Sequence, residues 1–112
     1  MALRMDKPWQ PLDADTVAKL PGQLGIYQIA DASGQVLYIG YAGGRSLFGL
    51  RGKLRDEVKQ RRQGATQFRV EVNMQYLTRH VELLMVHRAD HGALPRDNEV
   101  EGTPRLGRLS VA

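Results

Sequence analysis

Two short β-prone runs separated by a turn constrain this chain more than any other feature of its sequence. Residues 24–30 and 36–40 are rich in β-branched and aromatic side chains, and Asp31-Ala-Ser-Gly34 between them is typical of a turn. The pair therefore predicts a β-hairpin with a four-residue connection. A third strand is predicted at residues 67–74, because apolar and polar side chains alternate there with the two-residue period of a strand.

Three helices are predicted around these strands. Residues 13–20 form a short helix, and residues 46–63 carry apolar side chains at helical spacing, although Gly49 and Gly52 weaken its first turns. Residues 76–89 are densely apolar and predict a central helix. The order α-β-β-α-β-α predicts an α+β domain with a small three-stranded, mainly antiparallel sheet flanked by helices.

The length of 112 residues suits one domain. We assign it to residues 12–105, between a loose N-terminal arm of residues 1–11 and a C-terminal tail of residues 106–112. Cysteine is absent, which excludes a disulfide scaffold, a thiol nucleophile and any cysteine-ligated metal site. No apolar run reaches the roughly 20 residues of a membrane span, and the first residues lack the apolar core of a secretory signal. These features predict a cytoplasmic protein that does not contact a membrane.

Positive charge is concentrated in one segment of the chain. The net charge of +4 comes from 16 Lys and Arg residues against 12 Asp and Glu residues, and residues 45–62 hold seven bases against only Asp56 and Glu57. Arginine is well suited to bidentate phosphate contact. The segment predicts a face that binds nucleic acid, and the alternative is an ordinary solvated helix face. The candidate contact residues are Arg45, Arg51, Lys53, Arg55, Lys59 and Arg62.

Two tripeptides lie on the predicted hairpin, Gly25-Ile-Tyr27 and Tyr38-Ile-Gly40, with ten residues between them. Here the sequence resembles the GIY-YIG nuclease family, which includes homing endonucleases, some restriction enzymes and the cleaving module of bacterial excision repair. The resemblance covers roughly residues 18–100, and the elements come in the family's order. It implies a metal-dependent endonuclease that hydrolyses phosphodiester bonds in DNA, with DNA repair as one setting.

The resemblance also implies roles for individual residues. Tyr27 and Tyr38 would line the catalytic face, where one of them positions or activates the attacking water. Arg51 would stabilise the phosphate if an insertion follows the second tripeptide, and Arg45 is the substitute. Glu82, near the start of an apolar helix, would hold Mg²⁺ or Mn²⁺.

These residue types suit phosphodiester hydrolysis. An arginine and a divalent cation stabilise the negative charge on a pentavalent phosphorus, and Mg²⁺ keeps enough water ligands for one carboxylate to suffice. Glu82 lies amid apolar residues, where a lone carboxylate is costly without a positive partner. We expect four side chains to converge on one concave site: Tyr27, Tyr38, Arg51 and Glu82.

Each assignment has a simpler alternative. Tyr27 and Tyr38 would pack across the hairpin as ordinary strand neighbours, and Glu82 would pair at the surface with Arg79, one turn earlier. Arg51 would be a generic surface base.

The histidines and the function leave further alternatives open. His87 and His91 are four residues apart and could contact one metal ion, or they are ordinary residues of a helix end, like His80 on the same helix. The alternative function is a catalytically weak or inactive module that binds nucleic acid or protein. A protein partner or a homodimer would then supply specificity.

Overall fold

The computed structural model describes residues 4–101, so the predicted tail of residues 106–112 lies outside the described residues. The strands are β1 (Gln10–Pro11), β2 (Gly25–Ala30), β3 (Val36–Ala42) and β4 (Gln67–Val72). The helices are α1 (Ala14–Ala18), α2 (Gly49–Gln60), α3 (Tyr76–His91) and α4 (Arg96–Glu101). The strands form one antiparallel sheet in the order β1-β4-β2-β3. The architecture is α+β, with a four-stranded antiparallel sheet flanked by helices.

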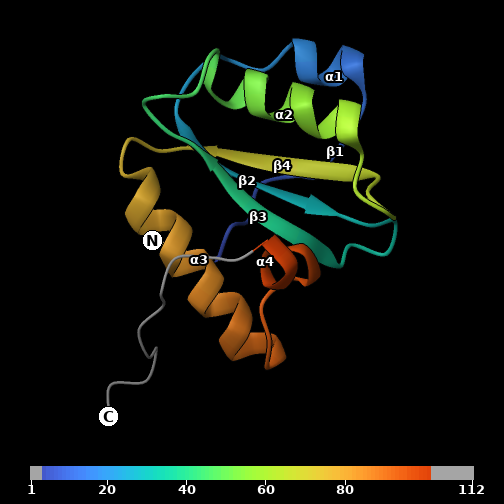
Figure 1. Ribbon diagram of the computed structural model, residues 1–112, viewed down its shortest axis with the longest axis vertical. Helices are drawn as coiled ribbons and strands as arrows, with labels where there is room; N and C mark the ends of the chain where they lie inside the picture. The colour runs from blue at the N-terminus through green and yellow to red at the C-terminus, as the bar shows by residue number, and fades with distance from the viewer. Residues whose placement is uncertain (1–3, 102–112) are drawn as a thin grey trace.

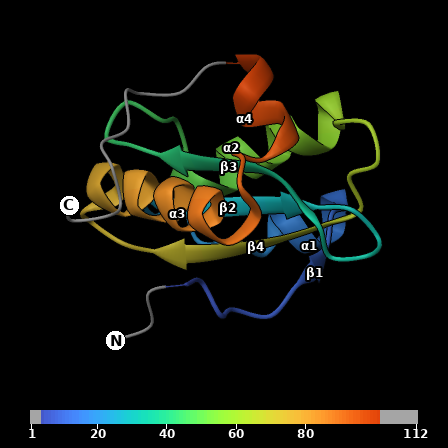
Figure 2. The same ribbon diagram turned by 90° about the horizontal axis from the view of Figure 1, so that it is seen from below.

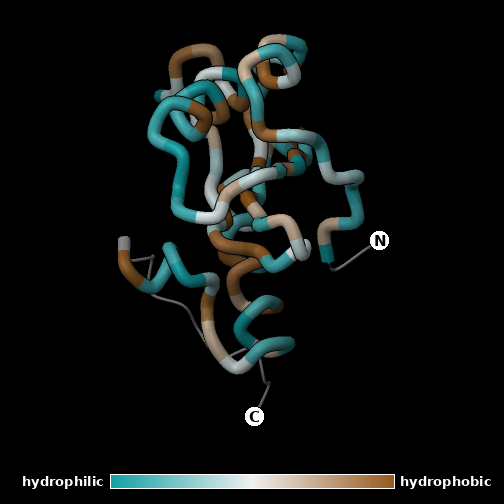
Figure 3. Tube along the Cα trace, turned by 90° about the vertical axis from the view of Figure 1, so that its right-hand side faces the viewer, coloured by the Kyte–Doolittle hydropathy of each residue, from teal (hydrophilic) through white to brown (hydrophobic). Residues whose placement is uncertain are grey.

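The helices lie in layers on either side of the sheet. Helices α1 and α2 cover one face and α3 covers the other, while α4 lies beside β3 (Figures 1 and 2). Hydrophobic stretches run through the middle of the molecule, between the helical layers, and others lie at its outer turns (Figure 3). None of the helices in the described residues has the length and apolar character needed to cross a membrane.

Neighbouring residues of β2 enter two different cores. Tyr27 packs with Leu50 and Leu54 of α2, whereas Ile26 packs with Leu83 of α3. This division follows from the alternation of side chains along a strand, which sends consecutive residues to opposite faces. The sheet therefore separates the side chains that α2 can reach from those that α3 can reach.

The sheet has one strand more than the three predicted from the sequence, because Gln10–Pro11 pairs with β4 at its edge. Two residues, one of them a proline that lacks an N–H, give no strand pattern in a sequence. The arm that precedes β1 also contacts the fold, since Met5 is buried in the core beside Leu83 and Leu84. Helix α4 is a second addition, beyond the three helices predicted from the sequence.

Side chains from two helices bind the backbone of Ile39 at the outer edge of β3, Asn98 of α4 and His80 of α3, whose Nε2 lies 3.0 Å from the Ile39 carbonyl oxygen. The N–H of Ile39 donates to Asn98 Oδ1 at 2.8 Å, and Asn98 Nδ2 donates to the carbonyl of Ile39 at 3.0 Å. Asn98 comes from α4 and is buried. An edge strand leaves such backbone groups unpaired, so the Asn98 amide satisfies the groups that a further strand would otherwise bind.

Candidate nucleic-acid interface

All four tyrosines of the chain line one cavity at the edge of β3. The cavity has a volume of about 620 Å³ and is called here the tyrosine cavity. Its lining holds two cationic side chains, one hydroxyl group besides the tyrosines, and no carboxylate among the described residues. The lining residues are Tyr27, Tyr38, Tyr41, Gly43, Gly44, Arg45, Ser46, Lys53, Tyr76 and Leu77.

The position of β3 at the sheet edge lets the cavity collect side chains from both faces. Tyr27 and Tyr38 belong to the α2 side, where their ring centroids lie 6.0 Å apart. Tyr41 instead stacks on Tyr76 of α3, with 5.7 Å between centroids and 14° between planes. The rings of Tyr41 and His80 also meet edge to face, with 4.9 Å between centroids, which holds the Tyr41 ring against α3.

The glycines of the two tripeptides are required by close packing around the tyrosines. A Cβ on Gly40 would lie 2.5 Å from the ring of Tyr27, its cross-strand neighbour. A Cβ on Gly25 would lie 2.1 Å from the carbonyl oxygen of Glu71 on β4. The pattern that suggested a nuclease therefore has a structural cause: a tyrosine ring and a neighbouring strand's backbone pack so closely on these two positions that only glycine fits.

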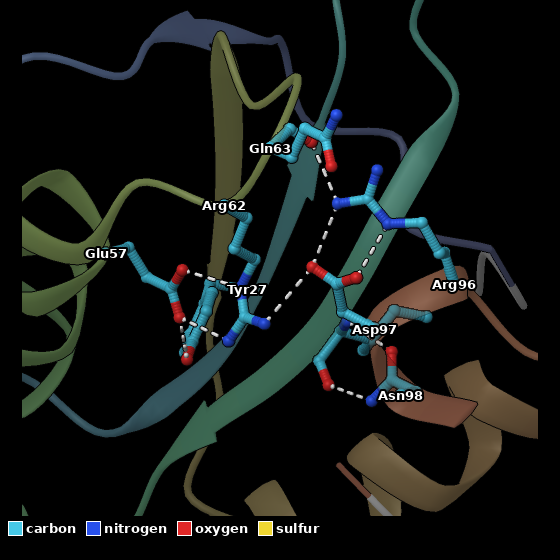
Figure 4. Close-up of polar contacts among 8 residues, drawn as sticks. Tyr27, Glu57, Arg62, Gln63, Arg96, Asp97 and Asn98 are labelled. Atoms are coloured by element: carbon cyan, nitrogen blue, oxygen red, sulfur yellow. Dashed lines mark hydrogen bonds and ion pairs between the residues drawn. The ribbon is translucent and has the colours of Figure 1, made fainter. Parts of the chain in front are cut away.

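Tyr27 is held by a buried polar network beneath the cavity (Figure 4). Its hydroxyl donates to Glu57 Oε2 at 3.2 Å, and Arg62 binds the same carboxylate through Nε and Nη2 at 2.8 and 2.9 Å. Arg62 also donates to Asp97 of α4 at 3.3 Å and lies 3.7 Å above the ring of Tyr38. The network connects α2, the hairpin and α4.

This network fixes the chemical role of Tyr27. Burial, and then the nearby Glu57 carboxylate, raise the pKa of Tyr27 well above its usual value. The phenol therefore stays protonated at neutral pH and acts as a hydrogen-bond donor to Glu57. A tyrosine in this state does not serve as a base toward water.

Arg62 is not available to a phosphate, contrary to its predicted place on the nucleic-acid-binding face. Its guanidinium is largely buried between Glu57 and Asp97. The sequence does not reveal this, because Asp97 is 35 residues away along the chain.

The other five basic residues predicted to bind nucleic acid lie on two sides of α2 and in the loop before it. Arg51, Arg55 and Lys59 follow one another at four-residue spacing and border a groove against α1; we call them the basic row. Lys53 and Arg45 face the tyrosine cavity instead. Arg51 therefore does not join the tyrosines as expected, and the substitute candidate Arg45 does.

An exposed aromatic ring begins the basic row. Phe48 has a left-handed backbone, with φ of 63°, and its ring is 56% exposed. The guanidinium carbons of Arg51 and Arg55 lie 5.9 and 5.3 Å from the centre of that ring. This conformation also delays α2, which begins at Gly49 rather than at Ser46 as predicted.

Glu82 lies on the opposite face of the sheet from Tyr27, so the expected convergence does not occur. Its carboxylate pairs with Arg79, one turn earlier on α3, and Arg79 also binds Glu71 of β4. Glu71 is opposite Ile26 in the strand register, which places this cluster on the α3 side. The structure thus has the surface pair with Arg79 that was the alternative for Glu82.

This arrangement does not fit the expected Mg²⁺ or Mn²⁺ site. The positive charge between Glu71 and Glu82 is the guanidinium of Arg79, which binds both oxygens of Glu71 and one oxygen of Glu82, where a cation would otherwise bind. Within residues 4–101 there is no group of three or more His, Cys, Asp or Glu side chains that could hold a metal ion. The rings of His87 and His91 lie 4.3 Å apart, and His87 Nδ1 hydrogen-bonds the carbonyl of Ala93.

Lowering the pH below about 6.5 is expected to destabilise the fold through two histidines of α3. Burial lowers the pKa of His80 and of His87, although each ring also hydrogen-bonds a backbone carbonyl. Below about 6.5 the unfolded chain therefore binds protons that the folded chain does not. The free energy of unfolding should therefore fall as the pH drops below about 6.5, and above that pH the contribution of the two histidines is retained in full.

Thermal melts between pH 7.5 and pH 5 measure this effect. His80→Gln keeps a donor for the carbonyl of Ile39 and removes the titrating group, so its melting temperature should depend less on pH. A wild-type melting temperature that stays level down to pH 5 would contradict the expectation.

Residues 1–90 match the family DUF7508, whose description is a domain of unknown function. The chain belongs to the DUF7508 family. A search of curated proteins finds no match to the sequence. The assignment to the GIY-YIG nucleases is therefore wrong. The two tripeptides were misleading because close packing around Gly25 and Gly40 accounts for both glycines. In addition, the tyrosines and Glu82 of this DUF7508 chain do not share a site.

Sequence reasoning missed several residues of the site in this DUF7508 member. Tyr41 and Tyr76 were not assigned roles, although Tyr41 directly follows the second tripeptide. Glu57 had a visible signal, because it lies three residues after Leu54 and seven after Leu50, on the apolar stripe of α2. An acid on such a stripe indicates a buried partner.

Proposed function

We propose that this chain is a nucleic-acid-binding module that holds the phosphate backbone of DNA through α2 and the loop before it. The observation that carries the proposal is a set of cations without carboxylate partners in residues 4–101. They are Arg45, Arg51, Lys53, Arg55 and Lys59.

The distribution of acids supports the proposal. The carboxylates that form ion pairs in the described residues do so with arginines outside this set. Glu57 pairs with Arg62, and Glu71 and Glu82 pair with Arg79. The positive field around α2 is thus neutralised little by side chains, as expected for a surface that exchanges counterions for phosphates.

Cleavage is not part of the proposal. The hydrolytic expectation required Glu82 and a metal ion beside Tyr27, but Glu82 belongs to the α3 side and is engaged by Arg79. The proposal therefore adopts the alternative function named in the sequence analysis, a module that binds nucleic acid with weak catalysis or none.

Binding to labelled linear DNA, measured across a range of salt concentrations, tests the proposal. If all five cations contact phosphates, log K should fall with log salt at a slope of about −4.5. We expect Glu82→Ala to bind like wild type in EDTA, because Glu82 does not belong to the binding surface. Added Mg²⁺ should weaken binding, because it competes with the protein for the phosphates.

Two results would contradict this function. Absence of binding at low salt would favour a protein-interaction module. Nicking that requires Mg²⁺ or Mn²⁺ and disappears in Glu82→Ala would favour the hydrolytic alternative, so the binding samples should also be run on gels with linear, nicked and branched DNA.

A further inference from the structure

Two hydroxyl groups in the tyrosine cavity remain as hydrogen-bond donors. Ser46 Oγ accepts the N–H of Gly43 at 3.1 Å, and the hydroxyl of Tyr76 accepts the N–H of Gly44 at 3.1 Å. A hydroxyl that accepts a hydrogen bond still has its own proton to donate. Within residues 4–101 the structure gives neither proton an acceptor.

These donors lie in the same cavity as two cations. Arg45 comes from the loop before α2, and Lys53 comes from the side of α2 that faces away from the basic row. Charged and neutral donors without a competing carboxylate are the chemistry that binds a phosphate group. The cavity thus has the groups for one phosphate, separate from the basic row.

The same cavity offers a fixed aromatic surface. Tyr41 is 37% exposed, and its ring is held by a stacked contact with Tyr76 and an edge-to-face contact with His80. An exposed ring held in one orientation is a platform on which a nucleobase stacks with little loss of side-chain entropy. The volume of about 620 Å³ lies within the range of small-molecule sites.

A paired base does not reach such a recess. In a duplex the faces of each base are covered by its neighbours, so a base that stacks on protein must leave the helix or start unpaired. An unpaired nucleotide brings a ring face and its phosphate into the cavity together. We infer that the tyrosine cavity binds one unpaired nucleotide, so that the preferred ligand is single-stranded nucleic acid. This inference rests on the proposed nucleic-acid binding and adds its strand preference.

The test compares three fluorescent probes at one salt concentration in EDTA: a thymidine oligonucleotide of about twelve nucleotides, a duplex of equal length, and a single strand whose bases are removed. The base-containing single strand should bind about tenfold more tightly than either of the others. Fluorescence anisotropy measures each affinity.

Substitutions separate stacking from a general loss of folding. Tyr41→Leu should weaken single-strand binding about tenfold and leave duplex binding unchanged, whereas Tyr41→Phe keeps the ring face and should bind like wild type. Trp9→Leu removes an aromatic ring that stacks with Arg69 outside the cavity, and it should change neither affinity. Melting curves check that each variant is folded.

The outcomes distinguish this inference from the proposed function. Equal affinity for single strand and duplex, unchanged by Tyr41→Leu, would overturn the inference and leave nucleic-acid binding in place. Failure to bind any of the three probes would overturn the proposed function and the inference with it.

Discussion

Replacing Glu57 with alanine is expected to cost about 3 kcal/mol of folding free energy or more, because it removes one partner of a buried ion pair. Glu57 is 6% exposed, binds Arg62 with both oxygens and accepts from Tyr27. Its loss removes the bidentate partner of Arg62, which keeps Asp97 at 3.3 Å, and it removes the Glu57 acceptor of the Tyr27 hydroxyl. In a domain of this size the melting temperature should fall by roughly 12 °C or more.

The neighbouring residue provides a matched control. Asp56 lies on the same helix but is exposed, so Asp56→Ala should melt close to wild type. Thermal and urea unfolding followed by circular dichroism measure both variants. If Glu57→Ala melts like Asp56→Ala, the network of Tyr27, Glu57 and Arg62 does not stabilise the fold.

Reversing the basic row is expected to have the largest effect on binding. Changing Arg51, Arg55 and Lys59 to glutamate should weaken DNA affinity about a hundredfold or more, and it should do so for all sequences alike. Three lost phosphate contacts should also reduce the salt slope by about 2.7. Arg62→Glu is not included, because it would break the buried pair with Glu57 and destabilise the fold, so that a loss of binding could not be told from a loss of folding.

A pair of single reversals controls for net charge. Lys59→Glu and Lys7→Glu alter the charge equally, but Lys7 lies on the N-terminal arm, away from the basic row. Only Lys59→Glu should change the slope. An equal loss in both variants would mean that binding depends on overall charge and not on the row.

Local patterns predicted much of this fold. The two-residue alternation along residues 67–74 and the turn at Asp31–Gly34 are short-range signals. Strand β4 lies within the first, and the two strands of the hairpin flank the second. β1 was missed because Gln10–Pro11 forms a strand only through its contact with β4. α4 was missed because its six residues contain no apolar stripe.

The site was harder to predict because it depends on which helix covers which face. Alternation alone says that Ile26 and Tyr27 point in opposite directions, but it does not say that α2 packs on Tyr27 and α3 on Ile26. Glu82 was therefore assigned to the wrong side of the sheet. Similarly, the cluster of bases in residues 45–62 predicted a single basic face, whereas the Arg62 side chain is buried and pairs with Asp97 of α4.

The contact between Asn98 and β3 gives helix α4 a role in preventing self-association. Asn98 occupies the backbone groups of Ile39 that a strand from another molecule would otherwise bind. Its helix begins at Arg96, beyond the residues 1–90 that define the family match. A fragment that ends at residue 90 would retain all four strands but lose the Asn98 acceptor of the Ile39 N–H, so we expect it to self-associate through the edge of β3 more readily than the longer chain does.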